Sequence, residues 1–125
     1  AHHPTEIKAT LKAARDLAGD HKIIVAFQPH LYSRTKILFN DFVMAFSDAD
    51  KVMVAPIYAA REKADSTISS QQLARSINGV GIDALNIDSF EDIKNEIKKI
   101  AKEGDLVVTM GAGELFKVAD ELVRW

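Results

Sequence analysis

Short runs of apolar, often β-branched residues alternate along this chain with longer segments whose apolar residues recur at helical spacing. This pattern is typical of a chain in which β-strands and α-helices alternate, and it predicts a mostly parallel sheet with helices on both faces. We expect right-handed crossovers, because parallel neighbours in one sheet are almost always joined that way. Ligands should meet the edge where the strands have their carboxyl ends. The loops expected there follow Phe27, Ile57, Ile87 and Met110.

Proline, glycine and capping residues set the expected boundaries of these elements. Pro4 suits the first turn of a helix and Gly19 suits its end, whereas Pro29 ends the first strand because it has no N–H to donate. Five helices are expected: over residues 4–18 and 34–49, from a cap at Ser69 or Ser70 through Ile77, from a cap at Asp88 or Ser89 to an end at Gly104, and over residues 114–125. Four strands are expected over residues 22–27, 51–57, 84–87 and 105–110.

Composition narrows the class of protein. A chain of 125 residues with 47% hydrophobic and 27% charged residues predicts a single domain over residues 1–125. With 16 basic and 18 acidic residues, the chain lacks the excess positive charge that would attract the phosphates of a nucleic acid. No nucleic-acid partner is therefore expected. No apolar stretch approaches a membrane span and residues 1–20 lack a secretory signal, which predicts a soluble, cytoplasmic protein. The absence of cysteine excludes thiol catalysis and disulfides.

The segment 28–35, which follows the first strand, concentrates the polar chemistry of the chain. Arg34 offers a planar fork of donors that matches a carboxylate or a phosphate. His30 titrates near neutral pH and can donate or accept. In the alternative interpretation Tyr32 packs, His30 is a satisfied loop residue, and Arg34 merely begins a helix.

Three other constellations carry weaker signals. His2 and His3 are adjacent and point in different directions, so they form a poor chelating pair, and no metal site is predicted; they also fit a frayed terminus or a tag remnant. Residues 58–63 bring charges to a strand end, although a solvated loop explains them equally well. Gly111 and Gly113 open a helix as an anion cradle would, but Phe116 replaces the third glycine of a dinucleotide fingerprint.

Several short motifs, taken in order along the whole chain, resemble the carboxy-terminal domain of the Mur ligases, and within that family the alanine-adding type. They lie at residues 1–6, 27–30, 32–35, 41–42, 49–50, 58–62 and 110–113. The resemblance implies a Rossmann-like α/β sandwich of three layers. It also implies an excised domain, because the amino-terminal UDP-sugar domain, the central ATP-binding domain and an Asp-Tyr pair expected before Ala1 are missing from this sequence.

The implied activity of the full-length enzyme is the ATP-dependent joining of L-alanine to UDP-N-acetylmuramate during peptidoglycan precursor synthesis. ATP and Mg²⁺ would be bound mainly by the central domain, and the sequence indeed lacks a G-x-x-x-x-G-K-[ST] loop. The fragment alone is expected to be inactive. It would contribute binding of the amino-acid carboxylate and closure of the domains, without a catalytic residue of its own.

The resemblance also assigns site residues. The implied amino-acid pocket is lined by His2, His30, Arg34, Gly111, Ala112 and Gly113. The residues implied near the domain interface are His3, Tyr32, Arg61 and Glu62. Leu31 departs from the family pattern, in which many members carry an arginine, and this departure predicts weaker binding of the amino acid.

Other functions remain open. One is the corresponding domain of a Mur-type ligase that adds another amino acid or a peptide. Another is a stand-alone module that binds a small molecule. A phosphoacceptor receiver-like domain fits the length and order of elements, but it needs clustered aspartates after the first strand, where Gln28 and Pro29 stand instead.

Overall fold

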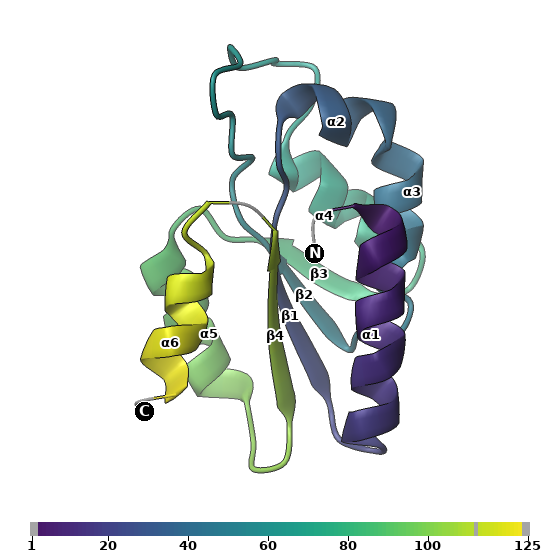
Figure 1. Cartoon of the computed structure of the whole chain (residues 1–125), viewed down its shortest axis with the longest axis vertical. Coiled ribbons are helices and arrows are strands. Elements are labelled where there is room, and N and C mark those ends of the chain that lie inside the picture. Colours follow the sequence, from purple (N-terminus) through teal and green to yellow (C-terminus); the bar gives the residue numbers. More distant parts are fainter. Residues whose placement is uncertain (1–2, 112, 124–125) are drawn as a thin grey trace.

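The computed structural model describes residues 3–111 and 113–123, and these residues form a four-stranded parallel sheet between two layers of helices (Figure 1). The strand order is β3-β2-β1-β4. The strands are β1 (Ile23–Gln28), β2 (Lys51–Val54), β3 (Asp83–Asn86) and β4 (Leu106–Gly111). The predicted α/β class and the predicted parallel sheet are therefore confirmed.

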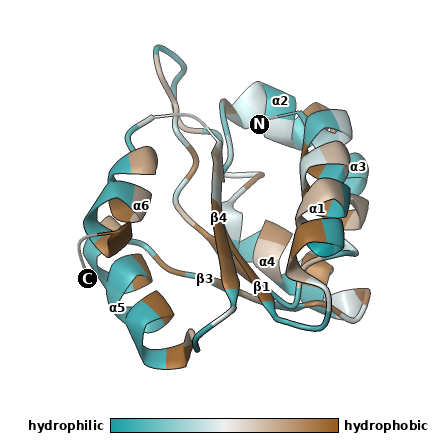
Figure 2. Ribbon diagram, turned by 60° about the horizontal axis from the view of Figure 1, so that its bottom comes forward, coloured by the Kyte–Doolittle hydropathy of each residue, from teal (hydrophilic) through white to brown (hydrophobic). Residues whose placement is uncertain are grey.

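The helices divide between the two faces of the sheet (Figure 1). One face is covered by α1 (Pro4–Ala18), α3 (Phe39–Val43), the short 3₁₀ helix η1 (Met44–Phe46) and α4 (Ser70–Gly79), whereas α2 (Tyr32–Ile37) lies beyond the carboxyl ends of the strands (Figure 1). The other face is covered by α5 (Phe90–Ile100) and α6 (Phe116–Val123). In Figure 2 the strands are largely brown and lie between helices that mix brown and teal, as expected for amphipathic helices on a buried sheet.

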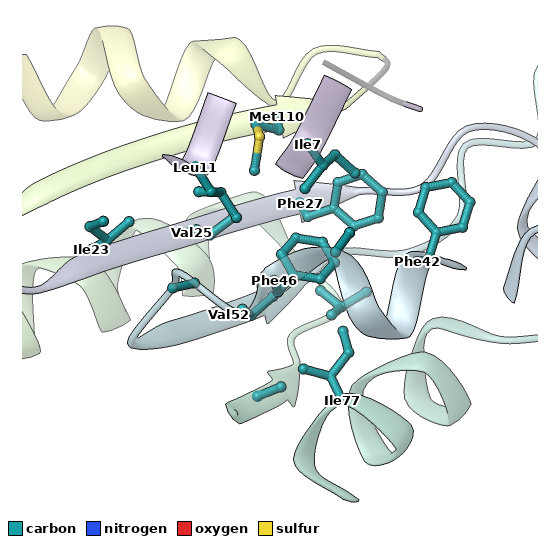
Figure 3. Packing of buried hydrophobic residues seen from close by; sticks show 14 of the residues in the cluster. Ile7, Leu11, Ile23, Val25, Phe27, Phe42, Phe46, Val52, Ile77 and Met110 are labelled. Carbon is teal, nitrogen blue, oxygen red and sulfur yellow. The ribbon is translucent and has the colours of Figure 1, made fainter. Parts of the chain in front are cut away.

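Phe27, near the carboxyl end of β1, organises the larger core. Its ring centroid lies 5.6 Å from that of Phe42 and 5.4 Å from that of Phe46, and all three side chains are fully buried (Figure 3). On the other face of the sheet Ile93 and Ile97 of α5 pack into a second core. Every residue of β1 is buried, which confirms the prediction that this strand is covered on both faces.

The prediction of one continuous helix over residues 34–49 is wrong. The chain forms α2, α3 and η1 instead, and it bends at Leu38, whose φ of −101° and ψ of 18° lie outside the α-helical range. The helical hydrogen bonds on either side persist, since Leu38 N donates to Arg34 O and Phe42 N donates to Leu38 O. We attribute the bend to packing, because Phe42 and Phe46 both have to reach Phe27 across the curved surface of the sheet.

The remaining boundaries differ from the predicted ones by a few residues. The first helix spans 4–18 as predicted, and α5 is capped by Ser89, whose hydroxyl accepts from Asp92 N at 3.0 Å. The last helix begins at Phe116 and not at residue 114, because residues 113–115 form a turn. The glycines at 111 and 113 therefore do not lie in the first turn of that helix.

A partly exposed ion pair ties α1 to the amino end of the sheet. The Asp50 carboxylate, just before β2, accepts from the Ile23 N–H at 2.8 Å and from Arg15 Nη2 at 2.8 Å. Burial by itself raises the pKa of Asp50, but the hydrogen bonds from Ile23 and Arg15 outweigh it, so the pKa lies below its ordinary value. The carboxylate thus bridges β1 and α1 in its ionised form.

Asp105 performs a similar task before β4. Its two carboxylate oxygens accept from the Lys102 N–H at 3.0 Å and from the Lys22 N–H at 3.1 Å. The Lys102 bond is the main reason that the pKa of Asp105 is lowered. Lys22 immediately precedes β1, so this carboxylate joins the starts of two neighbouring strands.

Within the described residues, no helix combines the length and the apolar character that crossing a bilayer requires.

Candidate functional site

A fold of this type is expected to bind ligands at its switch point, and the crevice expected here, at the carboxyl ends of β1 and β4, is the candidate site. The helices that follow β1 pack on one face of the sheet, while α6, which follows β4, packs on the other face (Figure 1). Two adjacent parallel strands whose connections leave toward opposite faces of the sheet form a switch point, where open α/β sheets bind their ligands. The predicted loop 28–35 and the predicted glycine turn flank this crevice.

Backbone hydrogen bonds join the loop after β1 to the loop after β2. Tyr58 N donates to Pro29 O at 2.8 Å, and Leu31 N donates to Tyr58 O at 2.8 Å. The rings of His30 and Tyr58 stack with their centroids 5.9 Å apart. The parallel pairing of the sheet is thereby extended beyond Pro29, which itself has no N–H to contribute.

His30 and Arg34, two residues that the sequence singled out, lie together. Arg34 Nη1 is 3.2 Å from His30 Nδ1. A guanidinium can only donate, so His30 Nδ1 is the acceptor, and its ring proton is assigned to Nε2 on this ground. Arg34 is half-buried, and among the described residues it has no carboxylate within ion-pair distance. It therefore offers a guanidinium whose charge the described part of the chain does not neutralise.

Glu62 reaches the start of α2 from the neighbouring loop. Its carboxylate accepts from the Ser33 N–H at 3.2 Å and from the Ser33 hydroxyl. The hydroxyl bond, followed by the backbone bond from Ser33, lowers the pKa of Glu62. The adjacent Arg61 is exposed, and it forms no ion pair with any residue that the structure describes. The two charged neighbours thus differ, because only Glu62 contacts the predicted site.

Gly111 and Gly113 allow a close approach of chain segments, which is a different role from the predicted anion cradle. A Cβ atom on Gly111 would lie 2.1 Å from Gln28 O, and one on Gly113 would lie 2.7 Å from Gln28 Oε1 and 3.2 Å from Tyr58 Cδ2. Both glycines have positive φ, 121° and 71°. Ala112, predicted between them, lies outside the described residues.

Gln28 begins the polar segment 28–35, but the sequence assigned it no role in the site. The residue is only 7% exposed, and its Nε2 donates to Pro56 O at 3.0 Å. Its Oε1 faces Gly113 and is a buried acceptor without a hydrogen-bond partner among the described residues. A buried, uncharged glutamine at the end of an apolar strand gives little local signal, since its importance comes from the loops that meet around it.

The other predicted residues occupy the periphery of this site. His3 caps α1, because its Nδ1 accepts from Thr5 N at 3.2 Å; His2 lies outside the described residues. Tyr32 lines a cavity of ≈280 Å³ with Pro56, Ser69 and Asn86, beside the crevice. Within residues 3–111 and 113–123, no group of three or more histidine, aspartate or glutamate side chains is arranged to hold a metal ion.

Comparison with known proteins identifies relatives. Residues 1–113 match the family described as "Mur ligase, glutamate ligase domain". The UDP-N-acetylmuramate–L-alanine ligase of Clostridium acetobutylicum is 50% identical over 120 residues, which are 96% of this chain and 26% of that protein. The ligase of the same name from Acetivibrio thermocellus is 50% identical over 125 residues, covering 99% of this chain and 26% of that protein. The chain thus spans about a quarter of the length of these curated relatives.

Solved structures agree with this match. The crystal structure of the UDP-N-acetylmuramate-alanine ligase from Thermotoga maritima superposes with a TM-score of 0.73 at 25% identity, over 99% of this chain and 24% of that one. A murein peptide ligase from Psychrobacter arcticus superposes with a TM-score of 0.72 at 21% identity, over 99% of this chain and 25% of that one. At that identity the second likeness supports the fold alone.

Proposed function

The chain belongs to the Mur ligase family, within which it matches the glutamate ligase domain, and from this premise we propose that it is the carboxy-terminal domain of an ATP-dependent UDP-N-acetylmuramate:L-alanine ligase. The names of its relatives at about half identity support the choice of L-alanine and UDP-N-acetylmuramate as substrates. Residues 1–125 form one domain in this proposal. The UDP-sugar and ATP domains belong to other parts of the full-length enzyme, which acts in peptidoglycan precursor synthesis in the cytoplasm.

The observation that carries the proposal is the half-buried Arg34 guanidinium, which has no carboxylate partner among the described residues and stands at the carboxyl end of β1. The carboxylate of L-alanine supplies the missing charge. A bidentate pair between a guanidinium and a carboxylate fixes orientation as well as adding energy. Once the carboxylate is oriented, the amino group of alanine points toward the activated muramoyl carboxyl group. This orientation lowers the entropic part of the activation barrier.

The other residues of the proposed pocket have supporting roles. His30 accepts a hydrogen bond from Arg34 and so restricts the rotation of the guanidinium. Gly111 and Gly113 allow the chain after β4 to lie close to Gln28 and so position it beside the proposed pocket. His2 and Ala112 belong to the proposed pocket on the family resemblance alone. His3, Tyr32 and Arg61 are proposed to lie near the interface with the other domains.

ATP and Mg²⁺ enter the proposal as requirements of the full-length enzyme. The described residues offer no cluster of metal ligands, and the sequence has no phosphate-binding loop of the G-x-x-x-x-G-K-[ST] type. These residues therefore do not fit either group, and no step of phosphoryl transfer is assigned to this chain. Its proposed contribution is to bind and orient the amino acid.

The test is Arg34→Ala in the full-length ligase. Loss of a charge-assisted pair costs about 1.5–3 kcal/mol, so kcat/KM for L-alanine should fall about 10- to 150-fold. The KM for ATP should stay within about twofold, since ATP is bound elsewhere. Arg34→Lys keeps the charge but loses the fork, and it should recover only part of the loss.

Arg75→Ala is the matched control, because Arg75 is an exposed arginine on α4, away from the crevice. It should leave both substrates unaffected. Equal losses for L-alanine and ATP in Arg34→Ala would contradict the proposed carboxylate role. A full-length wild-type enzyme that ligates glycine or another amino acid in preference to L-alanine would contradict the proposed substrate.

A further inference from the structure

We propose that the Glu62 carboxylate acts as the N-terminal cap of α2 from a distant loop and thereby sets the position of Arg34. Glu62 is a positioning residue in this proposal and does not contact the substrate. The inference rests on the proposed function, because it explains how the carboxylate-binding guanidinium is held in place.

The helix that carries Arg34 cannot hold its own first turn. It has only six residues, and a helix of that length is not stable in isolation. Its N-cap residue is Leu31, which has no side-chain oxygen to accept from the free N–H groups of the first turn. Leu31 also has a φ of 70°, which is unfavourable for a residue with a branched side chain. The start of α2 therefore depends on contacts from outside the helix.

Glu62 supplies the missing acceptor. Ser33 is the second residue of α2, and the N–H of the second or third residue is the usual partner of an N-cap side chain. Glu62 accepts from this N–H at 3.2 Å and also from the Ser33 hydroxyl. A carboxylate at this place is further favoured by the positive end of the helix dipole.

The loop that carries Glu62 is itself fixed to the loop after β1. Tyr58 exchanges backbone hydrogen bonds with Pro29 and Leu31, both at 2.8 Å. Glu62 N donates to Ala59 O at 2.9 Å and closes a turn in which Ala60 has a φ of 53°. Residues 58–62 thus hold the start of α2 at two points, and Arg34 is the residue that follows the second point.

Neutral groups of Ser33, the residue before Arg34, donate to the Glu62 carboxylate. Glu62 forms no ion pair with Arg34 or with any other described residue. Glu62 can therefore order the start of the helix without pairing with Arg34. The guanidinium keeps its charge for the carboxylate of the amino acid.

The test compares Glu62→Ala, Glu62→Gln and Ser33→Ala in the full-length ligase. Loss of a cap is expected to raise the KM for L-alanine about five- to tenfold in Glu62→Ala, with the KM for ATP unchanged within about twofold. Glu62→Gln retains an oxygen that can accept from Ser33 N, so its increase should be smaller. Glu103→Ala, which removes an exposed glutamate from a distant turn, is the matched control and should change neither constant.

A double-mutant cycle separates positioning from a general structural role. If Glu62 acts through Arg34, then Glu62→Ala should change the L-alanine KM less than about twofold in an Arg34→Ala background. An undiminished effect in that background, or equal increases in the KM for ATP and L-alanine, would overturn the inference. If Glu62→Ala does not fold, Glu62→Gln and Ser33→Ala take its place in the cycle.

The outcomes also distinguish the inference from the function on which it rests. A wild-type enzyme that does not ligate L-alanine, or an Arg34→Ala variant with an unchanged L-alanine KM, contradicts the proposed function. An Arg34→Ala variant that loses L-alanine affinity, together with cap variants that keep it, contradicts only the role of Glu62.

Discussion

The two ends of the sheet differ in how their charged groups are paired. At the amino end, Asp50 and Asp105 accept from the N–H groups of Ile23 and Lys22, and Asp50 is also paired with a cation. At the carboxyl end, Glu62 accepts only from neutral donors. Asp105 also accepts only from backbone N–H groups, so the contrast lies between two arginines: Arg15 is paired with Asp50 and serves the fold, whereas Arg34 has no carboxylate partner among the described residues and remains available to a ligand.

This division predicts which observable each substitution should change. A substitution at the amino end should lower the free energy of unfolding and leave the L-alanine KM of the full-length enzyme as it was. A substitution of a polar group at the carboxyl end should raise the L-alanine KM and change the free energy of unfolding much less. The glycine turn after β4 is an exception, because it serves packing and lies beside the crevice.

Gly111→Ala should have the largest effect. Although Gly111 lies at the carboxyl end of the sheet, its substitution should lower the free energy of unfolding. At a φ of 121°, a Cβ atom would lie 2.1 Å from Gln28 O, which belongs to the backbone and cannot move aside. Strain and overpacking together should lower the free energy of unfolding by about 3 kcal/mol or more. Urea unfolding of the 125-residue chain measures this loss.

Gly79→Ala is the control for that experiment, because no atom lies within 4 Å of its added Cβ. Placed at the end of α4, alanine should be neutral or stabilising by up to about 1 kcal/mol. Similar losses in both variants would show that Gly111 is not held in a special position.

Acid should weaken the amino end of the sheet. Folding lowers the pKa of Asp50 and of Asp105, so their contribution to stability is complete above the ordinary carboxyl pKa and is lost as the pH falls through the lowered values. Asp50→Asn should cost about 1 kcal/mol at pH 7, allowing for solvent screening, and should flatten the fall in stability below about pH 4.

The measurement is the free energy of unfolding against pH, with Asp16→Asn, an exposed residue of α1, as the control. An Asp50→Asn profile parallel to the wild-type profile would show that the carboxylate at the amino end does not contribute through its charge. A raised L-alanine KM in the full-length Asp50→Asn enzyme would contradict the division between the two ends.

Leu31→Arg should have the smallest effect, and it tests whether a second guanidinium at the carboxyl end of the sheet improves binding of L-alanine. The family resemblance places a second arginine here, and a partly exposed ion pair contributes about 0.2–1 kcal/mol, so the L-alanine KM should fall about 1.5- to 5-fold. Backbone strain at the φ of 70° is shared by leucine and arginine and should cancel. Leu31→Lys, which lacks the fork, is the control, and an unchanged KM in Leu31→Arg contradicts the prediction.

Much of the fold could be predicted because its signals are local. Pro4 and Gly19 mark the two ends of α1, and the apolar run of β1 requires no knowledge of its neighbours. The bend at Leu38 could not be predicted in this way. It arises from the contact of Phe42 and Phe46 with a strand that precedes them in the chain.

The candidate site divides along the same line. His30 and Arg34 stand in one short segment that the sequence singled out, and the structure places His30 Nδ1 3.2 Å from Arg34 Nη1. Their role with a substrate stays a prediction. Glu62 contacts Ser33 from another loop, and the buried amide of Gln28 lies against the segments that follow β2 and β4, so neither contact has a local pattern that reveals it.

The strand order has a consequence for how the protein is made. β4 is the last strand of the chain, yet it pairs with β1, which is the first, and Gly111 lies opposite Gln28 in their register. A chain emerging from the ribosome can assemble β1, β2 and β3 while the crevice still lacks one side. Pairings between distant segments form late and slowly. The candidate site is therefore expected to be completed late in synthesis, together with the part of the second core that β4 and α6 supply.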